Sequence, residues 1–348
     1  MTENDVELTP VREHHRFDEA SLWRYLDQHI DDDFSNAGVR QFEGGQSNPT
    51  FLIETARTRY VLRKKPPGQL LKSAHQVERE YRVMAALADT NVPVPKMYVL
   101  CDDESIIGTA FYVMEHVEGR VLIDTFLPSF TPQARTAVYK GFIESLAALH
   151  QVDYLAVGLE RHGRPGNYYA RQIHRWSEQY KASETETIPE MDRVMTWLPD
   201  NIPEDDETSI VHGDYRLGNC IIHPTEPRIA AILDWELSTI GHPLADLSYW
   251  CSMEYHSQKA FPENYRELGL PSEQELLDQY CELTGRAGIE NWTFYIAFNL
   301  FRTAGIRQGV YKRGLDGNAS SERWRESGPG AKASAIHAWR LVRDAGLA

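Results

Sequence analysis

Residues 211–219 read Val-His-Gly-Asp-Tyr-Arg-Leu-Gly-Asn, and Asp234 follows this segment at the end of a further apolar run. Short runs of aliphatic and β-branched residues flank the segment, and the run that leads into Asp234 spans 229–233. Runs of this kind predict short strands. We therefore expect a loop between two strands that carries Asp214 and Asn219, followed by a hairpin that delivers Asp234.

The spacing His-x-Asp-x-x-x-x-Asn within 212–219 is that of the protein-kinase catalytic loop. Phosphoryl transfer needs a carboxylate that orients and deprotonates the accepting hydroxyl, together with Mg²⁺ ions that neutralise the triphosphate. Mg²⁺ prefers oxygen ligands such as carboxylates. A lone Asp or Asn in a loop is usually a turn former, but the joint pattern favours phosphoryl transfer. A dinuclear metal hydrolase is the rival chemistry, and it generally draws on more His and carboxylate ligands than this cluster offers.

A glycine-containing turn precedes the first predicted strands. Gly44, Gly45 and Ser47 lie within residues 42–48, immediately before an apolar run at 51–53. Glycines let backbone N–H groups approach phosphate oxygens closely, which predicts a phosphate-binding turn, with a plain turn as the alternative. The sequence contains no Gly-x-x-x-x-Gly-Lys-Ser/Thr motif, which excludes a Walker-type NTPase.

The run 60–64 reads Tyr-Val-Leu-Arg-Lys, where kinases carry a strand with a phosphate-binding lysine. Arg63 holds the aligned position and Lys64 follows it. Neighbours on a strand face opposite sides, so only one of these cations can face the phosphates. Glu80 is the expected partner, because it lies beside the apolar stripe of a helix predicted over 77–88. A surface ion pair of little energetic value is the alternative.

The pattern along the chain predicts an α+β protein with a protein-kinase-like, two-lobed fold. We expect a flexible tail over 1–15, a small β-rich nucleotide-binding lobe over 16–117, and a larger, mainly helical catalytic and substrate lobe over 118–348. Thr131-Pro132 supplies a helix cap followed by a proline in the first turn, which predicts a long helix behind it.

Composition excludes several classes of protein. The 348 residues include 36 basic and 51 acidic side chains, a formal charge of −15 that disfavours nucleic acid and anionic membranes as partners. The longest charge-free apolar stretch near the C-terminus, 291–301, is too short to cross a bilayer. No signal peptide is visible and the four cysteines form no C-x-x-C pair. We expect a cytoplasmic monomer or homodimer without disulfides.

The sequence resembles the aminoglycoside phosphotransferase-like kinase family. The resemblance covers roughly residues 38–270. Its most specific part is the 211–219 segment together with Asp234. The other matching segments are Val-Glu-Arg-Glu at 77–80, Val-Pro-Val-Pro-Lys at 92–96 and Gly-His-Pro-Leu-Ala-Asp-Leu at 241–247. The forms at 62–68 and 233–236 are similar to those in the kinase domains of acyl-CoA dehydrogenase fusion proteins.

The resemblance implies a role for each matching residue. Asp214 would be the catalytic base, Asn219 and Asp234 would bind Mg²⁺, and Glu80 would pair with the phosphate-binding cation. The segment 114–117 resembles the interlobe hinge, where the Glu115 carbonyl and the Val117 N–H would meet the nucleotide base, and Asp246 would brace the catalytic loop. The sequence departs from the family at Arg63, which stands in place of the usual lysine.

These observations predict a kinase that moves the γ-phosphoryl of ATP or GTP to a hydroxyl of a small molecule, with a hydroxy acid or a hydroxyacyl-CoA as candidate acceptors. An aminoglycoside O-phosphotransferase and a catalytically silent nucleotide-binding module are the alternatives. Four basic residues at 302, 307, 312 and 313 would suit an anionic acceptor, but the mixed character of their helix favours a solvated surface.

Overall fold

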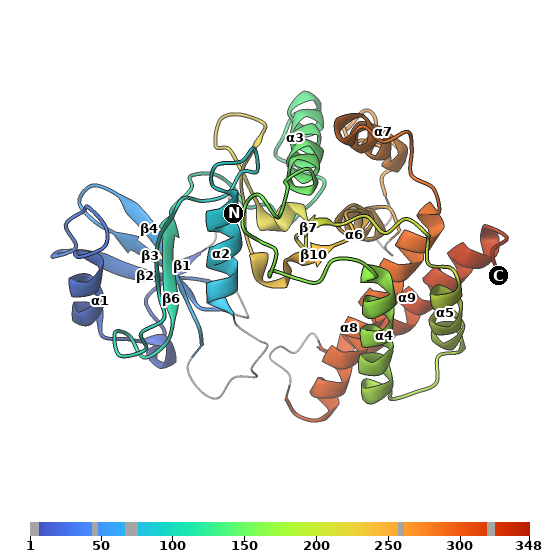
Figure 1. Ribbon diagram of the computed structural model, residues 1–348, viewed down its shortest axis with the longest axis horizontal. Helices are drawn as coiled ribbons and strands as arrows, with labels where there is room; N and C mark the ends of the chain where they lie inside the picture. The colour runs from blue at the N-terminus through green and yellow to red at the C-terminus, as the bar shows by residue number, and fades with distance from the viewer. Residues whose placement is uncertain (1–6, 44–47, 67–75, 257–260, 319–323) are drawn as a thin grey trace. The chain divides into compact units, whose positions relative to one another are not determined.

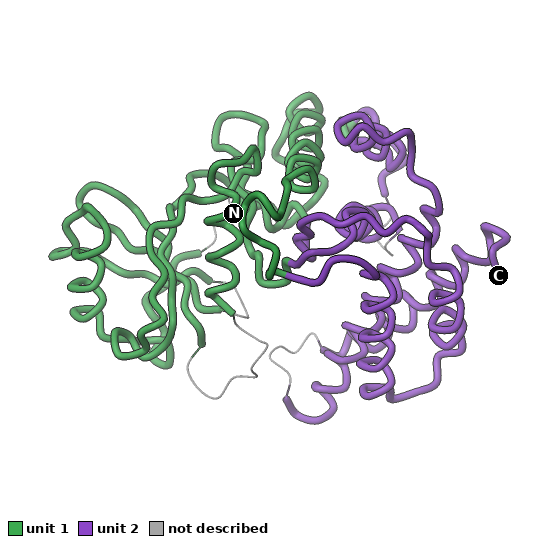
Figure 2. The backbone as a smooth tube through the Cα atoms, viewed as in Figure 1, with its two compact units in different colours: residues 1–162, 216–238, 268–270 green, residues 163–215, 239–267, 271–348 purple. Residues whose placement is uncertain are grey.

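The computed structural model describes residues 7–43, 48–66, 76–256, 261–318 and 324–348 (Figure 1). The chain divides into two compact units whose segments alternate along the sequence (Figure 2). The first unit contains residues 1–162, 216–238 and 268–270, and the second contains residues 163–215, 239–267 and 271–348. The lobe boundary expected at residues 117 and 118 falls inside the first unit.

The first unit is built on an antiparallel sheet with the strand order β1-β2-β3-β4-β6-β5 in the described part of the chain. The bounds of these strands are Leu8–Thr9, Gly38–Phe42, Thr50–Glu54, Arg59–Lys64, Met97–Cys101 for β5, and Phe111–Glu115 for β6. Residues 8–9 were expected to belong to a flexible tail. They instead pair with β2, because Leu8 and Thr9 lie opposite Phe42 and Gln41.

Helices cover both faces of this sheet (Figure 1). Helix α1, Glu19–Leu26, packs on one face against a core that includes Phe51, Tyr60 and Leu62. Helix α2, Val77–Leu87, contacts β5 and β6. Because side chains alternate along a strand, each strand contributes residues to both of these layers. The sheet is therefore buried on two sides.

A helix and a short hairpin complete the first unit. Helix α3, Pro132–His150, begins at the predicted place, where the Thr131 side chain accepts a hydrogen bond from the Ala134 N–H. The hairpin joins β8, Cys220–Ile222, to β9, Ile229–Ile232, and its strands match the two predicted apolar runs. Backbone hydrogen bonds between Arg120 and Ile222 connect this hairpin to the segment that leaves the sheet.

The second unit is mainly helical. Its short antiparallel pair consists of β7, Ser209–Val211, and β10, Thr239–Gly241. Gly241 is required there because a Cβ at this position would lie 2.5 Å from the ring of Tyr168. The helices of this unit, within the described residues, are α4 (Tyr168–Ser183), α5 (Pro189–Asp200), α6 (Leu244–Glu254), α7 (Glu273–Thr284), α8 (Trp292–Leu315) and α9 (Trp324–Asp344).

All four cysteines are free, and three of them are buried, as expected for packed thiols rather than a disulfide framework. Among the described residues, no helix is both long enough and apolar enough to span a membrane.

Candidate active site

The loop that follows β7 is held by a buried carboxylate of the second unit. Asp246 on α6 is 1% exposed and accepts hydrogen bonds from the His212 N–H at 2.6 Å and from the Gly213 N–H at 2.8 Å. Gly213 adopts φ = 85°, a left-handed conformation that favours glycine and turns the chain toward Asp214. The prediction that Asp246 braces this loop is confirmed.

Two side chains that the motif does not contain contact the same loop. The Tyr249 hydroxyl donates to Oδ1 of Asp214 at 2.6 Å. Arg302 on α8 donates from Nη2 to the Gly213 carbonyl at 2.8 Å. Arg302 was interpreted as part of a solvated surface, and this was wrong, because its side chain is buried against the loop. Helical spacing offered one signal, since Tyr249 lies three residues after Asp246 and thus on the same face of α6.

Asn219 and Asp234 lie in the first unit, on either side of the β8–β9 hairpin. Asn219 ends a single turn of 3₁₀ helix at Leu217–Asn219, and its carbonyl accepts the Leu233 N–H at 2.8 Å. This bond ties Asn219 to the residue that precedes Asp234. Asp234 itself has φ = 65°, a left-handed conformation that is uncommon outside glycine and is often found at functional sites.

Strand β4 separates the two candidate cations onto opposite faces of the sheet. Arg63 faces α2, where its Nε lies 3.1 Å from Oε2 of Glu80 and its Nη2 donates to Oδ1 of Asp234 at 2.8 Å. Lys64 is 2% exposed and lies over the ring of Phe17, with 5.5 Å from its Nζ to the ring centre. Arg63 is therefore the cation that lies beside Glu80, and which of the two cations contacts the phosphates stays a prediction.

Glu80 is completely buried at the centre of a polar cluster. Its Oε1 accepts from the Asn48 side chain at 2.8 Å, and its Oε2 accepts from the Tyr112 hydroxyl at 3.1 Å. Burial raises the pKa of Glu80 to about 7, although Arg63 opposes this shift. Burial also opposes the charge of Arg63, but the surrounding carboxylates, Glu80 first, outweigh it and raise the pKa of Arg63. Asn48 ends the 42–48 segment but was not predicted to contact Glu80, and Tyr112 lies outside the predicted motifs.

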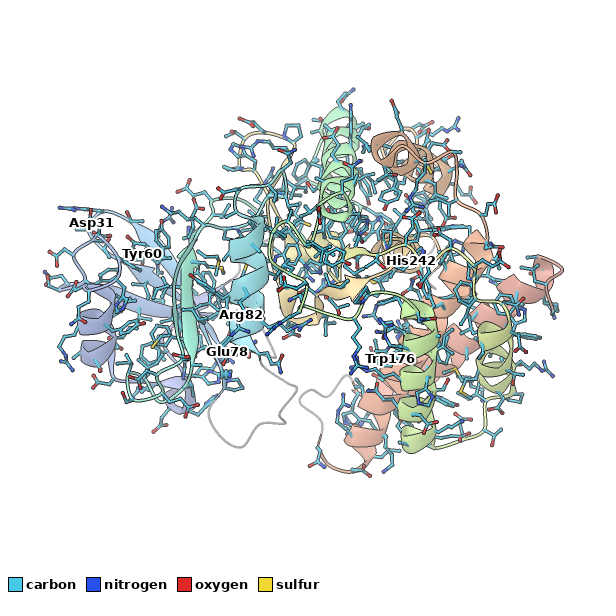
Figure 3. The ribbon with its side chains drawn as sticks, viewed as in Figure 1. Asp31, Tyr60, Glu78, Arg82, Trp176 and His242 are labelled. Atoms are coloured by element: carbon cyan, nitrogen blue, oxygen red, sulfur yellow. The ribbon has the colours of Figure 1, made fainter. Side chains whose placement is uncertain are left out.

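The neighbouring acidic residue on α2 has a different environment. Glu78, labelled in Figure 3, forms an ion pair with Lys65 and remains partly exposed. The burial of Glu80 agrees with its predicted place beside the apolar stripe of α2, whereas Glu78 lies farther from that stripe and is partly exposed.

Two of the remaining predicted nucleotide-binding residues, Glu115 and Val117, lie at or just beyond the end of β6. Glu115 is the last residue of β6, and its N–H donates to the Lys96 carbonyl at 2.8 Å. Val117 follows it and is half-buried. Gly44, Gly45 and Ser47 lie outside the described residues.

The donor set of the first unit fits a magnesium ion. Asn219 and Asp234 supply an amide oxygen and carboxylate oxygens, the hard ligands that Mg²⁺ prefers. One Asp234 oxygen already lies 2.8 Å from the cationic Arg63. Within the described residues, no group of three or more His, Cys, Asp or Glu side chains is arranged to hold a metal.

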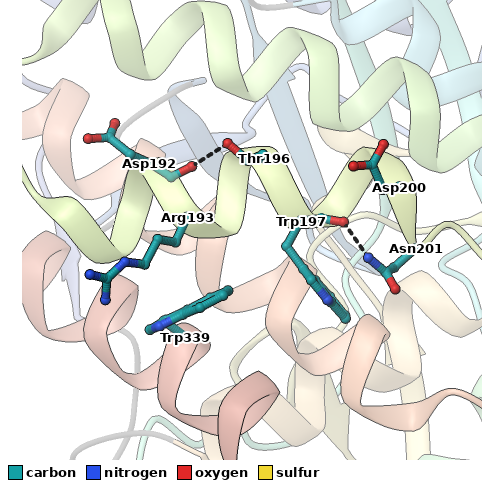
Figure 4. A pocket seen from close by; sticks show the side chains of 7 residues that line it. All are labelled: Asp192, Arg193, Thr196, Trp197, Asp200, Asn201 and Trp339. Atoms are coloured by element: carbon teal, nitrogen blue, oxygen red, sulfur yellow. Dashed lines mark hydrogen bonds between the residues drawn. The ribbon is translucent and has the colours of Figure 1, made fainter. Parts of the chain in front are cut away.

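One surface pocket lies elsewhere in the second unit. It has a volume of about 430 Å³ and lies between α5 and α9, where Trp197 and Trp339 contribute ring surfaces (Figure 4). The Trp197 indole N–H donates to the Leu347 carbonyl at 2.8 Å. None of the residues that the sequence motifs single out lines this pocket, so it is not the candidate active site.

The fold and these residues define a protein of the kinase-like phosphotransferase class. A family model described as the phosphotransferase enzyme family matches residues 38–283, more than half of the chain, and the chain belongs to this family. The predictions of an α+β kinase-like fold and of a phosphotransferase with an alcohol group as acceptor are confirmed by this match and by the structures below.

Individual proteins are similar to this chain in sequence, in fold or in both. Acyl-CoA dehydrogenase family member 11 of Rattus norvegicus is 45% identical over 334 residues, which cover 92% of this chain and 42% of the rat protein. A crystal structure from Ralstonia eutropha, provisionally named an aminoglycoside phosphotransferase, is 49% identical with a TM-score of 0.88, covering 94% of this chain and 99% of that chain. Spectinomycin phosphotransferase, solved with ADP and spectinomycin, shares the fold at 13% identity and a TM-score of 0.63, covering 94% and 98%.

This chain therefore spans less than half the length of the rat relative. The predicted resemblance to the kinase domain of acyl-CoA dehydrogenase fusion proteins is confirmed at the level of sequence similarity.

Proposed function

We propose that the chain is a small-molecule kinase that transfers the γ-phosphoryl of ATP or GTP to a hydroxyl group of a small metabolite. The single observation that carries this proposal is the cluster in which Arg63 contacts both Glu80 and Asp234. Kinases hold the triphosphate with a cation that is paired with a buried carboxylate, and they place a second carboxylate close to that cation.

In this proposal each residue has a distinct task. Asp214 orients the acceptor hydroxyl and receives its proton while the oxygen attacks the γ-phosphorus and the β-phosphate oxygen leaves. Arg63, held by Glu80, binds phosphate oxygens, and a guanidinium suits this task because it can donate two parallel hydrogen bonds. Glu115 and Val117 contact the nucleotide base, and Gly44, Gly45 and Ser47 contact the phosphates. The position of Arg63 beside Glu80 favours an active kinase over a catalytically silent nucleotide-binding module.

The donor set also supports Mg²⁺ as the cofactor. Asn219 and Asp234 would hold it, and when bound it neutralises the charge that develops on the triphosphate. The backbone bond between Leu233 and Asn219 keeps these two ligands in register across the hairpin.

For the acceptor, the relatives suggest two chemical classes. The name of the rat relative points to acyl-CoA chemistry, which favours a hydroxy acid or a hydroxyacyl-CoA. The name of the Ralstonia protein points to amino sugars, which keeps an aminoglycoside O-phosphotransferase as the second candidate. Hydroxy acids, hydroxyacyl-CoAs, amino sugars and simple alcohols should therefore be screened with labelled ATP and GTP.

The central test of the proposal is Asp214→Asn, with the hydrolysis of MgATP and the labelling of the acceptor panel as readouts. The substitution keeps the size of the side chain but removes the proton acceptor, so we expect turnover to fall by about 10²–10⁴-fold. Asp278→Asn is a matched control, because Asp278 is an exposed residue of α7 that accepts a hydrogen bond from Gln274. Wild-type turnover in Asp214→Asn would overturn the mechanism.

A further inference from the structure

Tyr249 is bonded to the residue that we propose as the catalytic base, although no kinase motif in the sequence contains it. Its hydroxyl donates to Oδ1 of Asp214 at 2.6 Å, which lies within the range for a hydrogen bond from a hydroxyl to an ionised carboxylate. Both residues belong to the second unit, and both are half-buried. A hydrogen bond to a charged oxygen in such a place is stronger than a surface contact.

Helix α6 fixes this loop through two residues one turn apart. Asp246 accepts the N–H groups of His212 and Gly213, and Tyr249, three residues later, reaches the Asp214 side chain. Residues at this spacing lie on one face of a helix. The same face therefore sets both the backbone of the loop and the orientation of the carboxylate that follows.

Helix α8 supports the arrangement from another side. The guanidinium of the buried Arg302 lies 5.0 Å from the centre of the Tyr249 ring and 5.8 Å from that of Trp176, which lies on α4 (Figure 3). The same guanidinium donates to the Gly213 carbonyl. Arg302 thus contacts both the tyrosine ring and the loop, and it restricts how far either can move relative to the other.

We propose that Tyr249 is a positioning residue for Asp214, which it orients through Oδ1 so that the carboxylate receives the proton of the acceptor in a fixed geometry. This inference rests on the proposed function. A general base must lie within hydrogen-bond reach of the proton it removes, and a freely rotating carboxylate spends only part of its time in that geometry. The Tyr249 hydroxyl removes this rotational freedom, while Arg302 holds the ring that carries it.

The experiment uses the full chain and measures steady-state hydrolysis of MgATP, in which water serves as the acceptor. Tyr249→Phe removes only the hydroxyl and keeps the ring that Arg302 contacts. We expect kcat to fall by about 10–100-fold while the KM for MgATP stays within about twofold, because the lost interaction acts on the chemical step and not on nucleotide binding.

Tyr255→Phe is the matched control. Tyr255 lies just after α6, and its hydroxyl donates to the Pro271 carbonyl at 2.9 Å within the same unit. This variant also loses one tyrosine hydrogen bond, but the bond does not reach Asp214, so we expect kcat to stay at the wild-type value. An equal loss of kcat in Tyr249→Phe and Tyr255→Phe would show a general effect on packing and would overturn the inference.

A double variant separates this inference from the proposed function. If Tyr249 acts through Asp214, Tyr249→Phe has no further effect on kcat in an Asp214→Ala background. Wild-type turnover in Asp214→Ala would contradict the proposed function itself. Reduced turnover in Asp214→Ala together with unchanged kcat in Tyr249→Phe would contradict the positioning role alone. Phosphorylation of Tyr249, detected by mass spectrometry after incubation with MgATP, would also overturn it, because the hydroxyl would then be a substrate.

Arg302→Met provides a second route should Tyr249→Phe fail to fold. Methionine keeps an apolar contact with the Tyr249 and Trp176 rings but loses the bond to Gly213. We expect a lower kcat at an unchanged KM for MgATP. An unchanged kcat in folded Arg302→Met would show that the contacts of Arg302 with Gly213 and Tyr249 do not affect Asp214, and it would contradict the role given to Arg302 here.

Discussion

At the scale of single residues, the first unit contains a carboxylate, Glu80, that has no access to solvent. Glu80 is 0% exposed, and its pKa is raised to about 7, first by burial. Arg63 and the Tyr112 hydroxyl act in the opposite direction, because each stabilises the ionised form. The site therefore keeps a buried charge only with the help of a few specific partners, which makes each of them a sensitive position.

Glu80→Gln should change how stability depends on pH. The pKa of Glu80 is higher in the folded chain than its ordinary value of 4.5, so the folded state retains a proton that the unfolded chain releases. The contribution of Glu80 to stability is thus present at low pH and is lost as the pH rises toward about 7. Glutamine does not titrate, so the wild type should lose up to about 3 kcal/mol relative to Glu80→Gln between about pH 5 and pH 8.

Urea unfolding of both proteins across this pH range measures the difference. Glu282→Gln, at an exposed position of α7, is the control and should follow the wild type at every pH. If the stability of the wild type relative to Glu80→Gln stayed constant or increased from pH 5 to pH 8, the raised pKa would be contradicted.

At the scale of elements, the alternation of side chains along β4 determines which of its two neighbouring cations, Arg63 or Lys64, lies beside Glu80. Tyr60, Leu62 and Lys64 point to the layer formed with α1, whereas Arg63 points to α2. A strand buried on both faces therefore places two neighbouring cations in unrelated environments. One lies among carboxylates and the other over an aromatic ring.

Arg63→Met and Lys64→Met should consequently have different effects. Arg63→Met removes the cation beside Glu80, so we expect the Kd for MgATP to rise by at least about tenfold, as for the loss of a charged contact of roughly 1.4 kcal/mol. Lys64→Met replaces a buried ammonium, whose pKa is lowered by burial, with an apolar chain, so nucleotide affinity should stay near the wild-type value. Calorimetric titration with MgATP measures both, and the reverse order of effects would contradict this placement of the two side chains.

The sequence alone predicted the strands around the 212–219 loop and the helix behind Thr131-Pro132, because these depend on local patterns. The bracing role of Asp246 was implied by the family resemblance. It could not choose between Arg63 and Lys64, since the choice depends on which helix packs on which face of β4. Arg302 was misassigned for a similar reason. Its helix carries a mixed pattern, and only the contact between α8 and the 212–214 loop shows that a charged residue is buried there.

At the scale of the whole molecule, the proposed tasks are divided between the two compact units. The residues proposed for nucleotide and metal, Arg63, Glu80, Asn219 and Asp234, belong to the first unit, and Asp214 with Tyr249 belongs to the second. The chain is strongly acidic, with a formal charge of −15. The proposed binding of a triphosphate near Glu80 and Asp234 would therefore require positive charge, which Arg63 would supply in part and a divalent cation would supplement.

This division predicts which substitutions abolish stabilisation by nucleotide. A ligand that binds only the folded state at about 100 times its Kd stabilises that state by about 2.7 kcal/mol. We expect this increase for the wild type and for Asp214→Asn with MgATP, because the proposed base does not contact nucleotide or metal. Asp234→Asn should lose most of this stabilisation by MgATP, because an amide is a weaker ligand for Mg²⁺ than a carboxylate. When the metal is chelated, ATP should give little stabilisation in any variant. Thermal unfolding with and without Mg²⁺ measures these differences, and equal stabilisation by ATP in both conditions would show that Asp234 does not act through a metal.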